Sequence, residues 1–219
     1  MAPVLAVVLT GKEHTTLPGA RDVQAASDGI VDDATAAIVG SELLIEGRPV
    51  ISLHRSDDLR TACRRFRTLT SDTEGRSARV GVGWGDNSHT AREHARAAVS
   101  LGSVLTPGME VVLFPDIQVA YDILRLGDVR GYISIIEPLL AHDRRYASGL
   151  IDTLETYYRC GGSVAPAARR LGIHRHTAGD RLRTARMLLG QDVDTFPMRL
   201  SIEAALIAYR LAAAGLSDT

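Results

Sequence analysis

Arginine side chains gather in one short stretch of the sequence, between Arg159 and Gly190. This window holds seven arginines and one acidic residue, Asp180, so its net charge is +6, whereas the whole chain has a net charge of −1. Guanidinium groups bind phosphate and guanine well, and one basic stretch on an otherwise acidic chain is typical of a nucleic-acid-binding element. A solvated helix face gives the same charge pattern, so charge alone leaves both interpretations open.

Two short helices joined by a tight turn are predicted within this stretch, at about residues 163–189. Ser163 can cap the first helix, and Pro166 then falls near its first turn, where proline is tolerated. Gly172 permits a turn at positive φ, and a second helix is expected over about 175–189. Its apolar residues are spaced four, three and four apart and so share one face; they are Ala178, Leu182, Ala185 and Leu189. This pattern predicts a helix-turn-helix motif.

The opposite face of the second helix carries polar side chains suited to reading DNA. A helix in the major groove contacts base edges with its outward, N-terminal residues, while flanking arginines hold phosphates. We expect base contacts from Arg175, His176, Thr177, Asp180 and Arg183. We expect phosphate contacts from Arg169, Arg170, Arg181 and Arg186.

The run GGSVAPAARRLGIHRHTAGDRL, residues 161–182, is similar to the helix-turn-helix that closes the PucR/CdaR family of bacterial transcription regulators, and more distantly to the Fis-type motif. The similarity extends upstream through LIDTLETYYRCGG and downstream through LLGQDVDTFPMRLSIEAALIAYRL, and covers about residues 137–211. It implies a cytoplasmic, non-enzymatic transcription regulator whose partner is double-stranded DNA. Because dimers that read two half-sites are common among such motifs, a homodimer is expected.

The second helix departs from the family pattern at several positions. The family usually has a pattern like His-Arg-Asn-Thr-Leu-Arg-Tyr-Arg-Leu where this chain has HRHTAGDRL, residues 174–182. Gly179 costs about 1 kcal/mol relative to alanine inside a helix, and Asp180 places a negative charge on the outward face. Either Asp180 accepts a hydrogen bond from a cytosine amino group, or the helix binds DNA weakly. The alternative function is therefore a regulatory dimerisation or interaction module with weakened or lost DNA binding.

Residues 1–117 alternate strand-like and helix-like segments. Val4–Leu9 is an apolar run with no basic residue before it, too short for a signal peptide or a membrane span, so we interpret it as a buried strand. Ala36–Ile45 and Pro49–His54 suggest a hairpin around a turn at Glu46-Gly47-Arg48-Pro49. Further strands are expected over 78–84 and 109–114, and helices over 56–69 and 88–102. The order suits a ferredoxin-like α+β sandwich.

This first half resembles the degenerate GGDEF-like domain that precedes the motif in many family members. ARVGVGW, residues 78–84, resembles the family's xxVGIGR strand, and the alanine-rich stretch 91–101 resembles the helix that follows. Active cyclases of that fold place several acids on the central hairpin, whereas the turn expected here offers only Glu46, so metal-assisted phosphoryl chemistry is not expected. The domain is expected to bind an unidentified small-molecule effector or to serve only for dimerisation.

Beyond Pro115 the strand signal ends, and helices are predicted over 118–126, 129–142 and 145–159. The fold class is therefore an α+β, ferredoxin-like domain over 1–117 followed by an all-α domain over 118–219. The apolar stripe of the last helix, about 198–211, is expected to form intramolecular core, a dimer surface, or both.

No cofactor and no metal site are expected. Cys63 and Cys160 lie far apart and match no metal-ligand spacing, which fits a reducing cytosol. The histidines show no metal-binding spacing either; they are His14, His54, His89, His94, His142, His174 and His176. The glycines of Gly81-Val-Gly83-Trp-Gly85 lack the lysine of a phosphate-binding loop and are interpreted as a strand end and turn.

Overall fold

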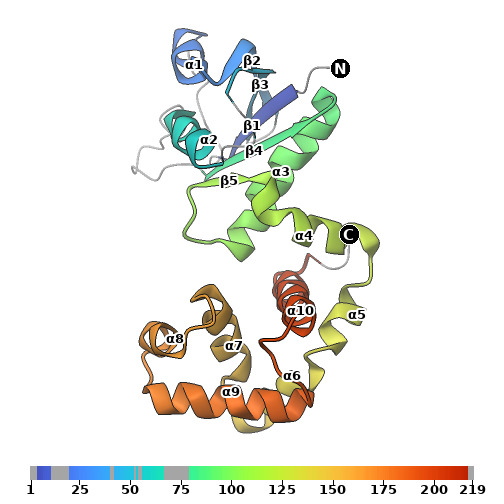
Figure 1. The fold of residues 1–219 in the computed structure, drawn as a ribbon. Coiled ribbons are helices and arrows are strands. Elements are labelled where there is room, and N and C mark those ends of the chain that lie inside the picture. Colours follow the sequence, from blue (N-terminus) through green and yellow to red (C-terminus); the bar gives the residue numbers. More distant parts are fainter. Residues whose placement is uncertain are drawn as a thin grey trace. The chain divides into compact units, whose positions relative to one another are not determined.

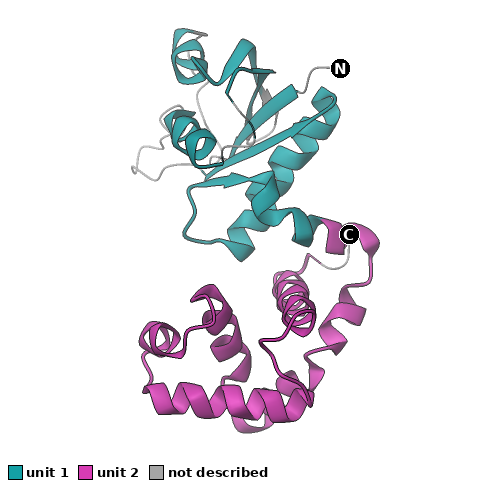
Figure 2. Ribbon diagram, viewed as in Figure 1, with its two compact units in different colours: residues 1–121 teal, residues 122–219 magenta. Residues whose placement is uncertain are grey.

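The computed structural model describes residues 4–10, 20–39, 42–51, 53, 56–66 and 79–216. It divides the chain into two compact units, residues 1–121 and 122–219 (Figure 2). The boundary expected after residue 117 and the division after Tyr121 both fall within one helix, α4 (Phe114–Leu126). His14 and His54 lie outside the described residues.

A five-stranded sheet forms the centre of unit 1 (Figure 1). Its middle strand β1 (Val4–Thr10) is antiparallel to β3 (Glu42–Pro49) on one side and to β4 (Arg79–Gly85) on the other. β2 (Val31–Val39) pairs antiparallel with β3 at one edge, and β5 (Val111–Leu113) pairs parallel with β4 at the other. The order β2-β3-β1-β4 is that of a ferredoxin-like sheet, so the predicted α+β fold class is confirmed.

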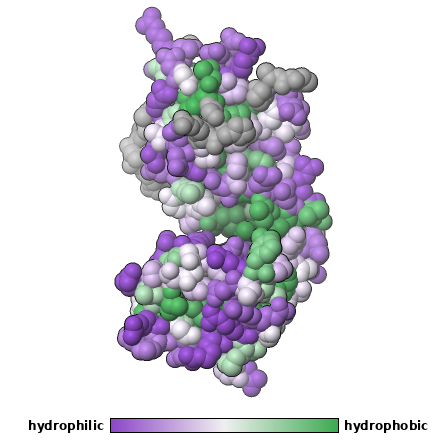
Figure 3. Space-filling model, in the orientation of Figure 1, coloured by the Kyte–Doolittle hydropathy of each residue, from purple (hydrophilic) through white to green (hydrophobic). Residues whose placement is uncertain are grey.

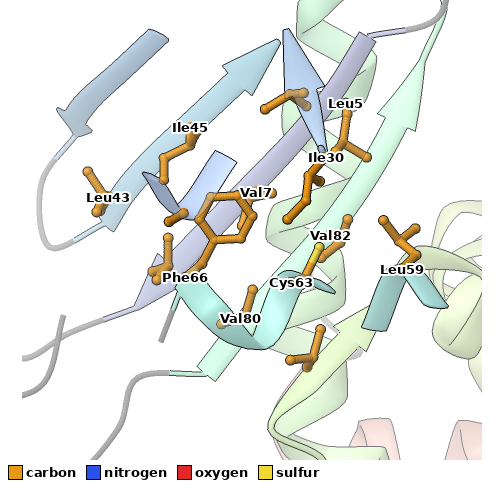
Figure 4. Close-up of a cluster of buried hydrophobic side chains, with 14 of the residues drawn as sticks. Leu5, Val7, Ile30, Leu43, Ile45, Leu59, Cys63, Phe66, Val80 and Val82 are labelled. Carbon is orange, nitrogen blue, oxygen red and sulfur yellow. The ribbon is translucent and has the colours of Figure 1, made fainter. Parts of the chain in front are cut away.

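Unit 1 buries both faces of its central strand. Alternate residues of a strand point to opposite faces, and Leu5, Val7 and Leu9 all lie in the larger core cluster. Helices α1 (Ala20–Ser27) and α2 (Ser56–Cys63) contribute to this cluster, as does Phe66, whose ring lies among Val7, Ile45 and Val80 (Figure 4). The expected apolar strand at 4–9 is therefore a buried strand.

The other face of the sheet lies against α3 (Ser88–Leu105). Ala6 and Val8 of β1 pack there against Ala91 and Ala95. Asn87 caps this helix, since its side-chain oxygen accepts a hydrogen bond of 2.9 Å from the Thr90 N–H. The alanine-rich stretch expected to be helical thus forms a thin layer that lies close to the strands.

The predicted hairpin turn at Glu46–Pro49 is wrong, because these residues form the second half of β3 and pair with β1 and β2. A Cβ at Gly47 would lie 2.6 Å from the Asp32 carbonyl oxygen, so the glycine serves a close approach of β2 and not a turn. Glu46 accepts a hydrogen bond of 2.8 Å from Arg92 Nε, and its carboxylate is half of an ion pair. Residues 40–41, between β2 and β3 in the sequence, lie outside the described residues.

The glycines of β4 let α3 lie directly on the sheet. A Cβ at Gly81 would come within 2.3 Å of the Ala95 carbonyl oxygen, and a Cβ at Gly83 within 2.3 Å of the Ala95 nitrogen. The run Gly81–Gly85 was expected to be a strand end and turn; instead it continues β4 to Gly85. Its glycines are therefore packing residues.

Gly83→Ala should lower the free energy of unfolding of unit 1 by about 1–3 kcal/mol, because the added methyl group overpacks a rigid backbone contact. Urea denaturation followed by circular dichroism measures this change. Gly108→Ala is the matched control, since a Cβ there meets no atom within 4 Å and Gly108 has no positive φ. Equal effects of the two substitutions would contradict the close packing of α3 on β4.

Unit 2 is helical. After α4 it contains α5 (Val129–Ser134), α6 (Glu137–Tyr146), α7 (Leu150–Arg159), α8 (Val164–Leu171), α9 (Arg175–Leu189) and α10 (Met198–Ala213). One core cluster joins α6, α7, α8, α9 and α10, and Ile133 of α5 packs against it; among its buried members are Ile136, Leu139, Leu154, Leu182 and Ile202. In the described part of the chain, no helix combines the length and apolar character needed to cross a bilayer.

Two predicted helices of this unit are shorter than expected. The stretch 129–142 is broken after Ser134, and the stretch 145–159 is interrupted between Tyr146, the end of α6, and Leu150, the start of α7. Ala147 and Gly149 both have positive φ, 48° and 69°, which a continuous right-handed helix does not allow. α10 uses most of its apolar stripe inside the unit, since Ile202 and Leu211 are buried, while Leu200 is 53% exposed.

Candidate nucleic-acid interface

The first helix of the motif, α8, ends in a tight left-handed turn. Gly172 has φ 68°, its N–H donates to the Arg169 carbonyl (3.2 Å), and the Ile173 N–H donates to the Ala168 carbonyl (3.0 Å). This pair of bonds is a Schellman motif, which satisfies the last carbonyls of a helix and reverses the chain. Ser163 stands at the N-cap position, as expected, but its side chain makes no capping hydrogen bond.

The second helix, α9, begins at Arg175, directly after the turn. His174 is its N-cap, and the His174 Nδ1 accepts a hydrogen bond of 3.3 Å from the His176 N–H. Ala178, Leu182 and Ala185 are buried, as their spacing predicts. Because these small and medium side chains face the unit's core, the opposite side of α9 faces solvent.

The outward face of α9 presents all five residues expected to contact bases. Arg175, His176, Thr177, Asp180 and Arg183 are each exposed, as are Arg169 and Arg170 at the end of α8. Among the described residues, no ion pair engages Arg169, Arg170 or Arg175. The face drawn in Figure 3 shows hydrophilic residues over much of this helical unit. These three arginines therefore present uncompensated positive charge to a ligand.

Arg181 and Arg186, which are expected to contact phosphates, also make contacts within the unit. Arg181 Nη1 donates to Thr153 Oγ1 of α7 at 3.2 Å. Arg186 Nη2 lies 2.6 Å from Asp194 Oδ2, and its Nε lies 3.3 Å from Asp192 Oδ1. The hydrogen bond that Arg186 donates to Asp194 is the main cause that raises the pKa of Arg186. Both side chains thus fix α9 against its neighbours.

Asp180 and Arg183 form an ion pair on the exposed side of α9. Arg183 Nη1 lies 2.6 Å from Asp180 Oδ1, one helical turn away, and both side chains are about two-thirds exposed, at 68% and 64%. The Thr184 hydroxyl donates a hydrogen bond of 3.0 Å to the Asp180 carbonyl, so this side chain is bound to the backbone of its own helix. The single acidic residue of the motif is therefore bound to one of its arginines.

α7 packs against α8 and α9, the two helices of the motif, and Asp143 determines where α7 begins. The Asp143 carboxylate accepts hydrogen bonds from the Leu150 N–H (2.8 Å), the Ile151 N–H (2.9 Å) and Ser148 Oγ (2.6 Å). Burial alone would raise the pKa of Asp143, but these hydrogen bonds and the nearby His142 outweigh burial and lower the pKa. A carboxylate at a helix N-terminus also complements the helix dipole.

A second anchor holds the segment that follows α9. The Tyr158 hydroxyl donates to the Val193 carbonyl at 2.7 Å, and both residues are buried. Burial is the main cause that raises the pKa of Tyr158. Sequence reasoning assigned no role to Asp143, Thr153 or Tyr158, because their partners lie on other elements. Only Gly149, a glycine directly before the start of α7, left a signal that the sequence shows.

The described residues of unit 1 hold no metal site and no reactive thiol. Among the described residues, no group of three His, Cys, Asp or Glu side chains lies close enough to hold a metal ion. Cys63 is fully buried in the core, and burial raises its pKa to about 12. A thiol held neutral in this way is a packing residue and not a nucleophile.

Gly179→Ala should raise the free energy of unfolding of unit 2 by about 1 kcal/mol, because alanine is the better helix former and a Cβ there meets no atom within 4 Å. Gly172→Ala also meets open space but has φ 68°, so it should lower that free energy by about 1–2 kcal/mol. Thermal unfolding of both variants followed at 222 nm measures the changes. Changes of the same sign would contradict the turn geometry.

Asp143→Asn should lower the free energy of unfolding by about 1–2 kcal/mol at pH 7 through loss of the charged cap. Because the folded-state pKa is lowered, this contribution is present above the unfolded pKa of about 3.9 and is lost as pH falls through the folded pKa. The difference from the unsubstituted protein should therefore stay constant from pH 7 to about 5 and shrink below about 4. Urea unfolding across this pH range measures the difference, with Asp122→Asn as the control. A difference between Asp143→Asn and the unsubstituted protein that stayed constant at every pH would contradict the cap.

Comparison with known proteins places this region in a described family. Residues 150–208 match the family described as the PucR C-terminal helix-turn-helix domain, which confirms the similarity inferred from the sequence. No curated protein matches the chain significantly. Among solved structures, the crystal structure of a regulator of polyketide synthase expression from Bifidobacterium adolescentis is similar over 96% of this chain and 81% of that chain, with 16% identity and a TM-score of 0.39.

Proposed function

Because residues 150–208 match a PucR-type helix-turn-helix domain, we propose that this chain is a sequence-specific DNA-binding transcription regulator. The observation that carries the proposal is the outward face of α9, where every residue expected to contact bases is exposed. In the proposed complex, α9 lies in the major groove of double-stranded DNA with its N-terminal turns against base edges. No cofactor and no catalytic step are required.

The arginines divide into two groups in this proposal. Arg169 and Arg170, at the end of α8, contact phosphates, since their side chains are exposed and neither enters an ion pair among the described residues. Arg181 and Arg186 hold α9 in place through Thr153, Asp192 and Asp194. Base contacts come from the exposed face, which comprises Arg175, His176, Thr177, Asp180 and Arg183.

We further propose that the protein binds its operator as a cytoplasmic homodimer. One helix-turn-helix makes a small contact with DNA, and two-fold symmetric half-sites double it. Phe196 and Leu200 are 81% and 53% exposed near the start of α10, and apolar side chains of this size at a surface favour contact with another protein chain. A small-molecule effector, if one is used, is assigned to unit 1.

Arg169→Ala and Arg170→Ala should each weaken binding to all duplexes alike and reduce the slope of log K against log salt by about 0.9, the value for one lost phosphate contact. Fluorescence anisotropy with duplexes from the protein's own gene neighbourhood, at several salt concentrations, measures both quantities. Arg130→Ala, an exposed arginine of α5, is the control and should leave the slope unchanged. An unchanged slope in both motif variants would contradict the phosphate assignment.

The alternative function is an interaction module with weakened or lost DNA binding. Two observations favour it: Asp180 neutralises Arg183, and Arg181 and Arg186 are committed within the unit. This alternative predicts no salt-dependent association with any duplex in the same anisotropy experiment. Salt-sensitive binding that depends on Arg169 and Arg170 would exclude it.

A further inference from the structure

The Asp180–Arg183 ion pair is expected to contribute little to the stability of the fold. Its atoms lie 2.6 Å apart, yet both side chains are about two-thirds exposed, at 64% and 68%. Exposed ion pairs between neighbouring turns of a helix contribute little to folding, because water screens them and two side chains lose freedom. The pair lies where the motif is open to a ligand, on the face opposite Ala178 and Leu182.

The pair presents a donor group and an acceptor group side by side. In the major groove, a G·C base pair offers two acceptors on guanine, O6 and N7, beside one donor, the cytosine amino group. Arg183 can donate to both guanine acceptors, while the second oxygen of Asp180 can accept from cytosine. In an A·T pair the two acceptors, adenine N7 and thymine O4, are separated by the adenine amino donor, so arginine cannot bind both side by side as it binds guanine, and the match with G·C is the better one.

The spacing along α9 fits a single reading position. Residues three apart on an α-helix are separated by about 4.5 Å along its axis, and base pairs follow one another every 3.4 Å or so. Two side chains already joined by a hydrogen bond therefore reach the same base pair or its immediate neighbour. Asp180 also restricts Arg183, which reduces the conformational entropy lost when the guanidinium binds.

We propose that Asp180 and Arg183 act together as the reader of one G·C base pair in the operator, with Asp180 both positioning Arg183 and accepting from cytosine. This inference rests on the proposed function, since it requires α9 to lie in the major groove. It gives the departure from the family pattern at Asp180 a role in specificity. A negative charge that merely faced DNA would repel phosphates without favouring any base.

The test uses the full chain and the duplex that it selects from a random pool. Each base pair of that duplex is then replaced in turn, and binding is measured for the unsubstituted protein and for Asp180→Ala, Asp180→Asn, Arg183→Ala and the double variant. At one G·C position the unsubstituted protein should discriminate by about 10- to 100-fold. Both alanine single variants should lose this discrimination and keep it at the other positions.

The remaining variants separate joint reading from independent effects. The double variant should be no less selective at that position than either single variant, which is the non-additivity expected of coupled residues. Asp180→Asn, which keeps an acceptor oxygen without the charge, should retain part of the preference. Asp122→Ala, an exposed acid on α4, is the control and should change nothing. Alanine favours helix at position 180, so α9 remains folded.

Two outcomes would overturn the inference, and they differ in what they say of the proposed function. If Asp180→Ala tightens binding to every duplex by one common factor and keeps the base preference, Asp180 acts only as a repelling charge; DNA binding then stands and joint reading does not. If the unsubstituted protein shows no salt-sensitive binding to any duplex, the proposed function fails, and the inference fails with it.

Discussion

The burial of one narrow apolar face of α9 is the interaction on which the motif depends. Ala178, Leu182 and Ala185 are almost completely buried and form that face together. Because two of the three are alanines, α9 lies close to the elements that it contacts. Leu182 provides most of the apolar area, and full burial of such a side chain contributes about 1.5–3 kcal/mol. The residues opposite this face, among them His176, Asp180 and Arg183, are exposed.

Polar contacts then fix how α9 is rotated and where it ends. The guanidinium of Arg181 lies against Gly149, where a Cβ would come within 2.9 Å of Nη1, and reaches Thr153. At the other end of α9, Arg186 ties the helix to Asp192 and Asp194. Neither arginine needs to contact DNA for these roles. Because Arg183 and Arg186 form ion pairs, the unpaired positive charge is smaller than the arginine content of the stretch indicates.

Much of this arrangement was predictable because local rules determine it. The bounds of α9, its buried face and the positive φ of Gly172 follow from helical spacing and from the preference of glycine for that conformation. The partners of Arg181 and Arg186 were not predictable, because Thr153 lies on α7, twenty-eight residues away, and a charge count treats every arginine alike. A charged side chain is assigned to a ligand or to its own fold only when its neighbours in space are known.

The same limit explains the error at β3. Glu46-Gly47-Arg48-Pro49 has the composition of a turn. Gly47 instead lies within β3, where the neighbouring strand β2 is so close that a side chain would meet the Asp32 carbonyl. The helix breaks before α7 were missed for a related reason. Asp143 caps α7 from the preceding helix, and a pattern read along one helix does not contain a contact made by another.

The separation of roles on α9 bears on how such a protein evolves. Ala178, Leu182, Ala185 and Arg181 determine the fold, whereas His176, Thr177, Asp180 and Arg183 project from it without supporting any buried contact. Substitutions in the second group leave the core intact, so their stability effects are small. Under the proposed function, gene duplication followed by change at these few positions can therefore produce paralogues that differ in target preference while they share one scaffold.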